Sequence, residues 1–297
     1  MKSKTISTII HCTRELFSTN NIESADLDAQ IIITHVLRKD RIFLLSHPDT
    51  PVSEEECLEI DSLAKRRISG EPIAYLTGKK EFYGYDFFVD RNVLIPRPET
   101  EYLIEKGIEF LKFRNSKIAK SQNVVLDLGT GSGCIIVSLA KSLRHSGTLP
   151  RRPLFYATDI SEKALEVAKK NAENNLTIEQ LSNLRFLQSD LFSNPLLPDK
   201  FDLILANLPY VPHNAEEQEN LKFEPKSAIF ADDNGSSIIK EFLKQAKSRL
   251  NENGLTLVEL DPRNALEIKN FAEKLYLNRT IKLTKDYAGH DRYLEIK

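Results

Sequence analysis

The sequence of 297 residues has few cysteines and no long apolar run. Its three cysteines, Cys12, Cys57 and Cys134, are scattered and share no zinc-ligand spacing with histidine. This pattern predicts reduced thiols and no metal site. No stretch approaches the roughly 18 apolar residues of a membrane-spanning helix, and no long apolar segment follows the N-terminus. We therefore expect a cytoplasmic protein that does not bind a membrane.

The sequence also has little net charge. Its 41 Lys and Arg against 43 Asp and Glu leave a formal charge of −2. Proteins that bind nucleic acid over a broad surface are usually strongly basic, so no stable nucleic-acid binding is expected. A hydrophobic content of 41% and a charged content of 28% are ordinary for a globular protein. The length allows two domains.

The N-terminal part has the spacing of helices. Apolar residues recur at helical intervals over 5–70, which predicts a small helical bundle. Ser53 and Glu56 form a capping box that starts the third helix, and Leu58 is expected on the apolar face of that helix. The basic run Lys65–Arg67 is interpreted as a solvated helix end. No residue of this part has a catalytic pattern, so a role in partner recognition is expected.

An aromatic connecting segment follows. Residues 81–89 are expected to be extended, 90–92 to form a turn, and 93–95 to form the second strand of a β-hairpin. Pro98 suits the first turn of the next helix. Arg97 has two interpretations at this point, a salt bridge at the end of the hairpin or a lid residue over a ligand.

The C-terminal two thirds alternates strands with helices, which predicts a parallel sheet. Strands are expected at 124–128, 154–159, 184–191, 203–206 and 255–260, with 280–283 and 292–296 as a final antiparallel pair. Helices are expected from Cys134 to Leu143, from Ser161 to about Asn174, and over 237–250 with Gly254 as the stop. The predicted fold class is therefore α/β.

A glycine-rich loop follows the first of these strands, as Gly129-Thr130-Gly131-Ser132-Gly133. A dinucleotide fingerprint would place its third glycine one position later, and no triphosphate-binding loop ending in Gly-Lys-Ser/Thr is present. With Asp127 in the strand and Asp159 ending the next one, the pattern resembles the S-adenosylmethionine loop of class I methyltransferases.

This resemblance implies roles for single residues. The loop would hold the amino-acid part of the cofactor, and Asp159 would accept the ribose hydroxyls. Asp190 would accept the adenine amino group, and Leu191 would border the adenine ring. Cys134 is interpreted as a small residue at a helix start, with a reactive thiol as the alternative.

The stretch Asn207-Leu208-Pro209-Tyr210 follows an apolar strand, at the edge where α/β sheets bind ligands. The Asn207 oxygen and the Leu208 carbonyl can accept both hydrogens of a planar N–H₂ group, which suits methylation of an amide or arylamine nitrogen. Tyr210 would pack on the flat group, and Pro209 keeps Leu208 extended. Asn207 would also contact the cofactor. We expect catalysis to depend on the Leu208 carbonyl and not on the Leu208 side chain.

The order of these motifs, together with segments elsewhere in the chain, resembles the bacterial peptide chain release factor glutamine N5-methyltransferases. The resemblance rests on 70–78, Ile95-Pro96-Arg97-Pro98-Glu99-Thr100-Glu101, the glycine loop, Asn207–Tyr210, Glu224-Pro225 and 286–292. It implies a Rossmann-like seven-stranded, mostly parallel sheet in a domain over 99–297. A helical recognition domain over 1–78 and a β-hairpin linker over 79–98 would precede it.

The resemblance also implies the substrate, the glutamine in the Gly-Gly-Gln motif of class I release factors. The family usually has proline where Leu208 stands, and some relatives have an aromatic residue in place of Leu191. Three alternatives stay open: a methyltransferase for a ribosomal-protein glutamine, an adenine N6-methyltransferase acting on RNA or DNA, and a module that binds a translation factor without catalysis.

Overall fold

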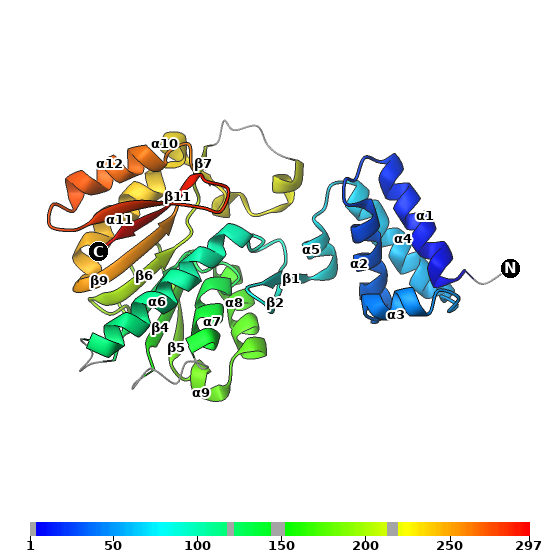
Figure 1. The fold of residues 1–297 in the computed structure, drawn as a ribbon, viewed down its shortest axis with the longest axis horizontal. Coiled ribbons are helices and arrows are strands. Elements are labelled where there is room, and N and C mark those ends of the chain that lie inside the picture. The colour runs from blue at the N-terminus through cyan, green and yellow to red at the C-terminus, as the bar shows by residue number, and fades with distance from the viewer. Residues whose placement is uncertain (1–3, 118–121, 144–151, 213–218) are drawn as a thin grey trace. The chain divides into compact units, whose positions relative to one another are not determined.

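The structure is a computed structural model that describes residues 4–117, 122–143, 152–212 and 219–297. The chain forms two compact units, one of Met1–Lys79 with Gln218–Phe223 and one of Lys80–Glu217 with Glu224–Lys297 (Figure 1). Within the described ranges, no helix is both long and apolar enough to cross a membrane.

The first unit is helical. It contains α1 (Ile6–Thr19), α2 (Ala25–Leu37), α3 (Arg41–Ser46), α4 (Glu54–Ile68), α5 (Ile73–Thr77) and the 3₁₀ helix η3 (Glu219–Phe223). The predicted helical bundle is confirmed, and Ser53 and Glu56 do form the capping box of α4. The prediction for Leu58 is wrong, because its side chain is 64% exposed. Helix α4 buries Cys57, Ile60 and Leu63 instead, so its apolar face is rotated away from Leu58.

The basic end of α4 is not simply solvated, which corrects the expectation for Lys65–Arg67. Arg67 donates to the buried carboxylate of Asp28 over 2.7 Å. Arg66 donates twice to Glu71, from Nε over 2.9 Å and from Nη2 over 2.8 Å. Buried carboxylates need such partners, because an unpaired buried charge is costly. Both arginines therefore belong to the structure of this unit.

The second unit is built on the predicted seven-stranded, mostly parallel sheet. Its strands are β3 (Val124–Leu128), β4 (Leu154–Asp159), β5 (Leu184–Gln188), β6 (Phe201–Ala206), β9 (Leu250–Glu259), β10 (Ile281–Lys285) and β11 (Asp291–Ile296). They lie in the order β10-β11-β9-β6-β3-β4-β5. Strands β9, β6, β3, β4 and β5 are parallel, and β11 runs antiparallel to both β9 and β10.

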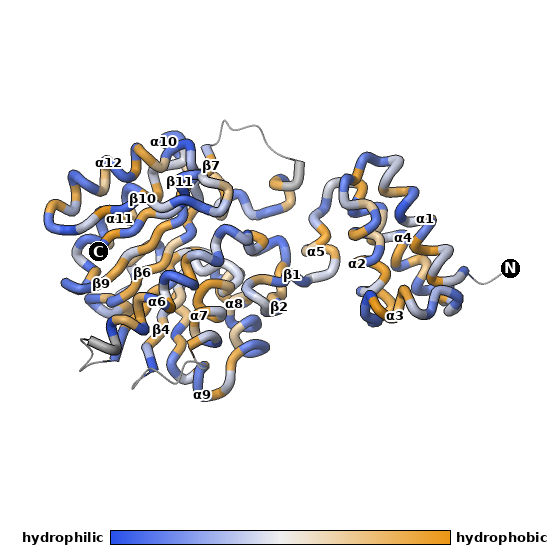
Figure 2. The backbone as a smooth tube through the Cα atoms, viewed as in Figure 1, coloured by the Kyte–Doolittle hydropathy of each residue, from blue (hydrophilic) through white to orange (hydrophobic). Residues whose placement is uncertain are grey.

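Helices cover both faces of this sheet (Figure 1). On one face the core includes α6 (Glu101–Lys117), α7 (Cys134–Ser142) and α8 (Glu162–Asn175), and on the other α11 (Ser237–Arg249) and α12 (Ala265–Leu275). Along β6, Leu203 and Leu205 face the first core, whereas Ile204 and Ala206 face the second. A strand covered on both faces is mostly apolar, as Figure 2 shows for the centre of the sheet, although β6 also contains the buried Asp202.

Smaller elements complete the second unit: β1 (Lys79–Phe82), β2 (Tyr85–Phe88), η1 (Pro98–Thr100), α9 (Ile178–Leu181), β7 (Val211–Pro212), η4 (Lys226–Ala228), β8 (Phe230–Ala231) and α10 (Asp232–Gly235). The sequence analysis did not predict α12, β7 or β8. The hairpin is β1–β2, so residues 93–95 are not its second strand, and the turn at 90–92 does not belong to it. The real turn is at Tyr83 and Gly84, which have φ of 53° and 73° as a two-residue turn requires. Gly254 lies inside β9 and does not stop α11, which ends at Arg249.

Candidate active site

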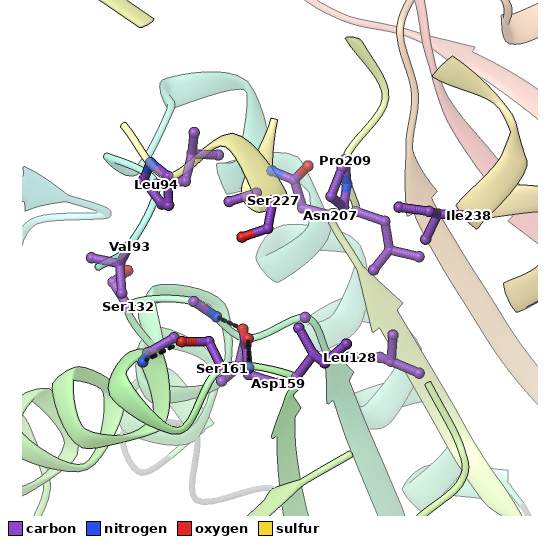
Figure 3. A pocket seen from close by; sticks show the side chains of 18 of the residues that line it. Val93, Leu94, Leu128, Ser132, Asp159, Ser161, Asn207, Pro209, Ser227 and Ile238 are labelled. Atoms are coloured by element: carbon purple, nitrogen blue, oxygen red, sulfur yellow. Dashed lines mark hydrogen bonds between the residues drawn. The ribbon is translucent and has the colours of Figure 1, made fainter. Parts of the chain in front are cut away.

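A cavity of about 530 Å³ opens at the carboxyl ends of β3, β4 and β6. Most of the predicted site residues line it: Gly129, Thr130, Gly131, Ser132, Asp159, Leu191, Asn207, Leu208 and Pro209. Figure 3 shows Asp159 and Asn207 on opposite sides of the cavity. Gly133 and Tyr210 are not among the described residues that line it.

The glycine loop is held by backbone hydrogen bonds. Gly129 N and Thr130 N both donate to the carbonyl of Thr158 at the end of β4, over 2.9 and 2.8 Å. Gly129 has a φ of 74°, and a Cβ there would lie 3.0 Å from Cδ2 of Leu208. Glycine therefore suits position 129, because other residues rarely adopt this φ and because a Cβ would crowd the side chain of Leu208.

Asp159 ties this loop to the start of α8. Its carboxylate accepts from Gly131 N and from Ser161 N, each over 2.9 Å. Burial raises the pKa of Asp159, and backbone hydrogen bonds from Ser161, Gly131 and Ile160 oppose that shift. A carboxylate has about four lone-pair positions, so Asp159 keeps acceptor capacity for a ligand hydroxyl.

Asp127 lies beneath the loop and is fully buried. It accepts from Thr130 Oγ1 over 2.6 Å, and burial raises the pKa of Asp127 to about 7. The nearby Ser132 lines the cavity, and its hydroxyl has no hydrogen-bond partner in the described structure. The buried thiol of Cys134 has a pKa raised to about 12 by burial, which favours its interpretation as a small helix-start residue.

Asn207 follows β6 and is held by a side-chain network. Its Nδ2 donates to Thr100 Oγ1 over 3.0 Å, and Thr100 Oγ1 donates to Glu259 Oε2 over 2.7 Å. The second carboxylate oxygen, Oε1, accepts from the Tyr210 hydroxyl over 3.2 Å. Burial raises the pKa of Tyr210, so its phenol stays protonated and donates. Burial likewise raises the pKa of Glu259 to about 7, against the hydrogen bond from Thr100 and the charge of Arg292.

Leu208 has a packing role that the sequence analysis did not anticipate. Its side chain is buried in the core beneath the site and reaches Gly129. The expectation that only its carbonyl matters therefore needs correction on structural grounds. Leu191, on the cavity wall, has a φ of 48°, and its carbonyl accepts from Ser189 Oγ over 2.7 Å.

The loop after Asn207 is braced by Gly235 of α10. Gly235 has a φ of 84°, and a Cβ there would lie 1.9 Å from the carbonyl oxygen of Tyr210. Strand β7, just after Tyr210, pairs with β8, just before α10. This contact was not predicted, because no residue pattern over 230–235 indicates that Gly235 lies against Tyr210.

Arg97 both forms a salt bridge and lies at the cavity, so it has features of its two interpretations, an ion-pair residue and a residue over a ligand. Its Nη2 donates to Glu224 Oε1 over 2.5 Å, and Arg97 also lines the cavity. Glu224 is buried and accepts in addition from Ile95 N over 3.0 Å. Thr100 and Glu259 were missed as site residues. The only sequence feature that could have indicated a site role for Glu259 is its place as a single carboxylate at the end of the apolar run of β9.

Comparisons with known proteins match both parts of the chain. A family model described as PrmC N-terminal domain matches residues 8–78, and one described as methyltransferase domain matches residues 119–259. The hMettl16 catalytic domain, solved with a MAT2A 3′UTR hairpin, has a TM-score of 0.53 at 14% identity, covering 89% of this chain and 86% of that one. The similarity to this solved structure concerns the fold alone, and it agrees with the predicted class I methyltransferase fold.

Two relatives that match over nearly their full length have the same name. The chain is 38% identical to the release factor glutamine methyltransferase of Rhodopirellula baltica, covering 99% of this chain and 96% of that protein. It is 34% identical to the release factor glutamine methyltransferase of Haemophilus influenzae, covering 94% and 93% respectively. The family predicted from the motifs is confirmed: this chain belongs to the release factor glutamine methyltransferases.

Proposed function

We propose that this chain transfers a methyl group from S-adenosylmethionine to a glutamine side chain of a class I peptide chain release factor. The acceptor is the N5 nitrogen of the glutamine in the Gly-Gly-Gln motif, and the reaction takes place in the cytoplasm. The observation that carries the proposal is the Asn207 amide, held through Nδ2 on the wall of the cavity that the glycine loop also lines. The names of the full-length relatives support the substrate.

The residues around the cavity fit S-adenosylmethionine. A volume of about 530 Å³ is within the usual range for small-molecule sites. The unpartnered Ser132 hydroxyl and the loop backbone suit the amino-acid part, and Asp159 has acceptor capacity for the ribose hydroxyls. Leu191 offers an apolar border for adenine. When bound, the cofactor supplies an electrophilic methyl group.

The Asn207 side of the cavity suits a weak amide nucleophile. An amide nitrogen is unreactive because its lone pair is delocalised into the carbonyl. The Asn207 Oδ1 and the Leu208 carbonyl would accept its two hydrogens, orient it, and stabilise the positive charge that develops on it. Tyr210, fixed through Glu259, would pack against the planar group. No general base is needed, since the nitrogen loses a proton readily once it has been alkylated.

The partner of the chain is then a folded protein. We expect the helical domain, over 1–78, to recognise the release factor, and the domain over 99–297 to take the Gly-Gly-Gln loop. The segment over 79–98 links the two. No stable binding to nucleic acid or to a membrane is expected, in keeping with the formal charge of −2.

The test compares possible methyl acceptors. The protein is incubated with methyl-labelled S-adenosylmethionine and, separately, with a purified class I release factor, ribosomes, RNA and DNA, and the labelled residue is mapped by mass spectrometry. We expect label on the Gly-Gly-Gln glutamine, and none on a release factor with alanine in its place. Label on a ribosomal-protein glutamine or on adenine would overturn the proposal in favour of the corresponding alternative. Transfer to adenine should also weaken steeply with salt.

A further inference from the structure

We propose that Thr100 and Glu259 are positioning residues, which fix the Asn207 amide with its oxygen free for the substrate. The inference rests on the proposed function, because a substrate N–H is what this oxygen would accept. Three elements supply the network: η1 ends at Thr100, β6 ends just before Asn207, and β9 ends at Glu259. Neither Thr100 nor Glu259 is a catalytic residue in this account, since both act through Asn207.

The direction of each hydrogen bond follows from the chemistry of the groups. Burial raises the pKa of Glu259 to about 7, so Glu259 is ionised at a pH above that value. An ionised carboxylate can only accept, so the single Thr100 proton then goes to Glu259 Oε2, 2.7 Å away. The Thr100 oxygen is then left with lone pairs only toward Asn207, 3.0 Å away. Asn207 must therefore present its NH₂ to Thr100, and its Oδ1 is held away from Thr100.

Burial makes this arrangement hard to reverse. Thr100 is 2% exposed and Glu259 is 1% exposed, so water is not available to replace either partner. The Tyr210 hydroxyl takes the other carboxylate oxygen and adds a second donor. A flipped Asn207 would place an oxygen against the Thr100 oxygen and would turn its NH₂ away from Thr100. Because two facing acceptors leave both groups unsatisfied, the flipped state is disfavoured.

The chain contains a matched control network. Thr284 donates to Glu295 over 2.7 Å, and Tyr102 donates to the same carboxylate over 3.0 Å. This second set has the same three residue types and a threonine hydroxyl that donates to a carboxylate, although it is half-buried and both donors share one oxygen. None of its members lines the described cavity. Substitution at Thr284 therefore removes an equivalent hydrogen bond without touching Asn207.

The first experiment compares Thr100→Val, Thr100→Ser and Thr284→Val in methyl transfer to the release factor. We expect Thr100→Val to lower kcat by roughly 10²-fold, the usual scale for a displaced reacting group, with less than a threefold change in the KM for the cofactor. Thr100→Ser keeps the hydroxyl and should recover most of that loss. Thr284→Val should leave kcat near the wild-type value. Thermal unfolding of each variant reports the stability cost separately.

The second experiment reverses the polarity of the network. Asn207→Asp places a carboxylate against the Thr100 oxygen and should be as slow as Asn207→Ala. Adding Glu259→Gln supplies an amide N–H that can donate to Thr100, which frees the Thr100 proton for the new carboxylate. We expect the double variant to be at least tenfold faster than Asn207→Asp alone.

The outcomes separate this inference from the proposed function. If the wild-type protein does not methylate the release factor, the proposed function fails. If the wild-type protein is active but Thr100→Val matches Thr100→Ser in kcat, the positioning role is overturned. If Thr100→Val does not fold, the polarity reversal decides, and equal rates for Asn207→Asp and the double variant would reject the inference.

Discussion

The two sides of the cavity are built in different ways. The side with the glycine loop is local: residues 129–133 follow one strand, and their amides bond to Thr158 and Asp159 at the end of the next. The side with Asn207 is not local. Its amide depends on Thr100, which lies 107 residues before it, and on Glu259, which lies 159 residues after Thr100. Backbone geometry therefore organises one side, and a side-chain network organises the other.

Leu208 joins the two sides. Its side chain fills the space that the missing Cβ of Gly129 leaves, while its neighbour Asn207 contacts Thr100. The comparison predicts that variants on the Asn207 side slow transfer, that variants on the loop side weaken cofactor binding, and that loss of the Leu208 contact destabilises the fold.

The largest effect is expected for Asn207→Ala. Removal of the acceptor for the substrate N–H should lower kcat by roughly 10²-fold to 10³-fold, as loss of one charge-stabilising contact does in other enzymes. Cofactor affinity, measured by calorimetry, should fall less than tenfold. Asn175→Ala on α8, away from the cavity, is the control. Wild-type kcat in Asn207→Ala would remove this residue from the mechanism.

Leu208→Ala should destabilise the second unit. Truncation of a buried leucine leaves a cavity and typically costs about 2–5 kcal/mol. Chemical denaturation measures the change in unfolding free energy. Leu196 is 72% exposed, so Leu196→Ala should change the unfolding free energy by less than about 0.5 kcal/mol. Equal stability of the two variants would contradict the packing role of Leu208.

Asp159→Ala tests the loop side. Loss of a charged acceptor for the ribose should weaken S-adenosylmethionine binding by about 1.5–3 kcal/mol, the scale for a hydrogen bond to a charged group. Isothermal titration calorimetry gives the dissociation constant directly. Asp199→Ala, at an exposed side chain, should bind like the wild type. An unchanged dissociation constant in Asp159→Ala would place the ribose elsewhere.

Each side of the cavity also contributes a pH dependence of stability through one buried carboxyl. Burial raises the pKa of Asp127 and of Glu259 to about 7. Each group holds its proton to a higher pH in the folded chain than in the unfolded chain. The unfolding free energy should therefore fall as pH rises from about 4.5 to about 7, by at most about 1.4 kcal/mol per pH unit for each group.

Denaturation in urea across this pH range measures the slope. Asp127→Asn should remove the contribution of the loop side, and Glu259→Gln that of the Asn207 side. A slope that neither substitution changes would mean that these carboxyls do not titrate there.

The sequence predicted the parts of the fold that depend on neighbouring residues. The strand before Gly129, the cap at Ser161 and the capping box at Ser53 follow from local patterns, and the structure has all three. The hairpin turn was misplaced because Asp90–Asn92 also has turn residues. Residues 90–92 do form a turn, in which Asn92 N donates to Asp90 Oδ1 over 2.9 Å. No strand follows this turn in the described segment up to η1.

Thr100, Glu259 and Gly235 could not be recognised as parts of the site from local sequence patterns. Thr100 lies in the segment 95–101 that supported the resemblance, but that segment does not indicate its contact with Asn207. Glu259 comes close to Asn207 only because the sheet order places β9 beside β6. Gly235 likewise matters through its contact with Tyr210. Long-range juxtapositions of this kind leave no periodicity or spacing in a single sequence.

The central claim is that the glycine-loop side of the cavity binds the cofactor and the Asn207 side promotes methyl transfer. Its most direct test is single-turnover methyl transfer to the release factor with the cofactor at saturating concentration. Under these conditions weaker cofactor binding does not lower the observed rate, whereas a defect in the transfer step does. We predict that Asp159→Ala then transfers at nearly the wild-type rate, while Asn207→Ala remains at least roughly 10²-fold slower. Equal rates for the two variants, fast or slow, would contradict the account.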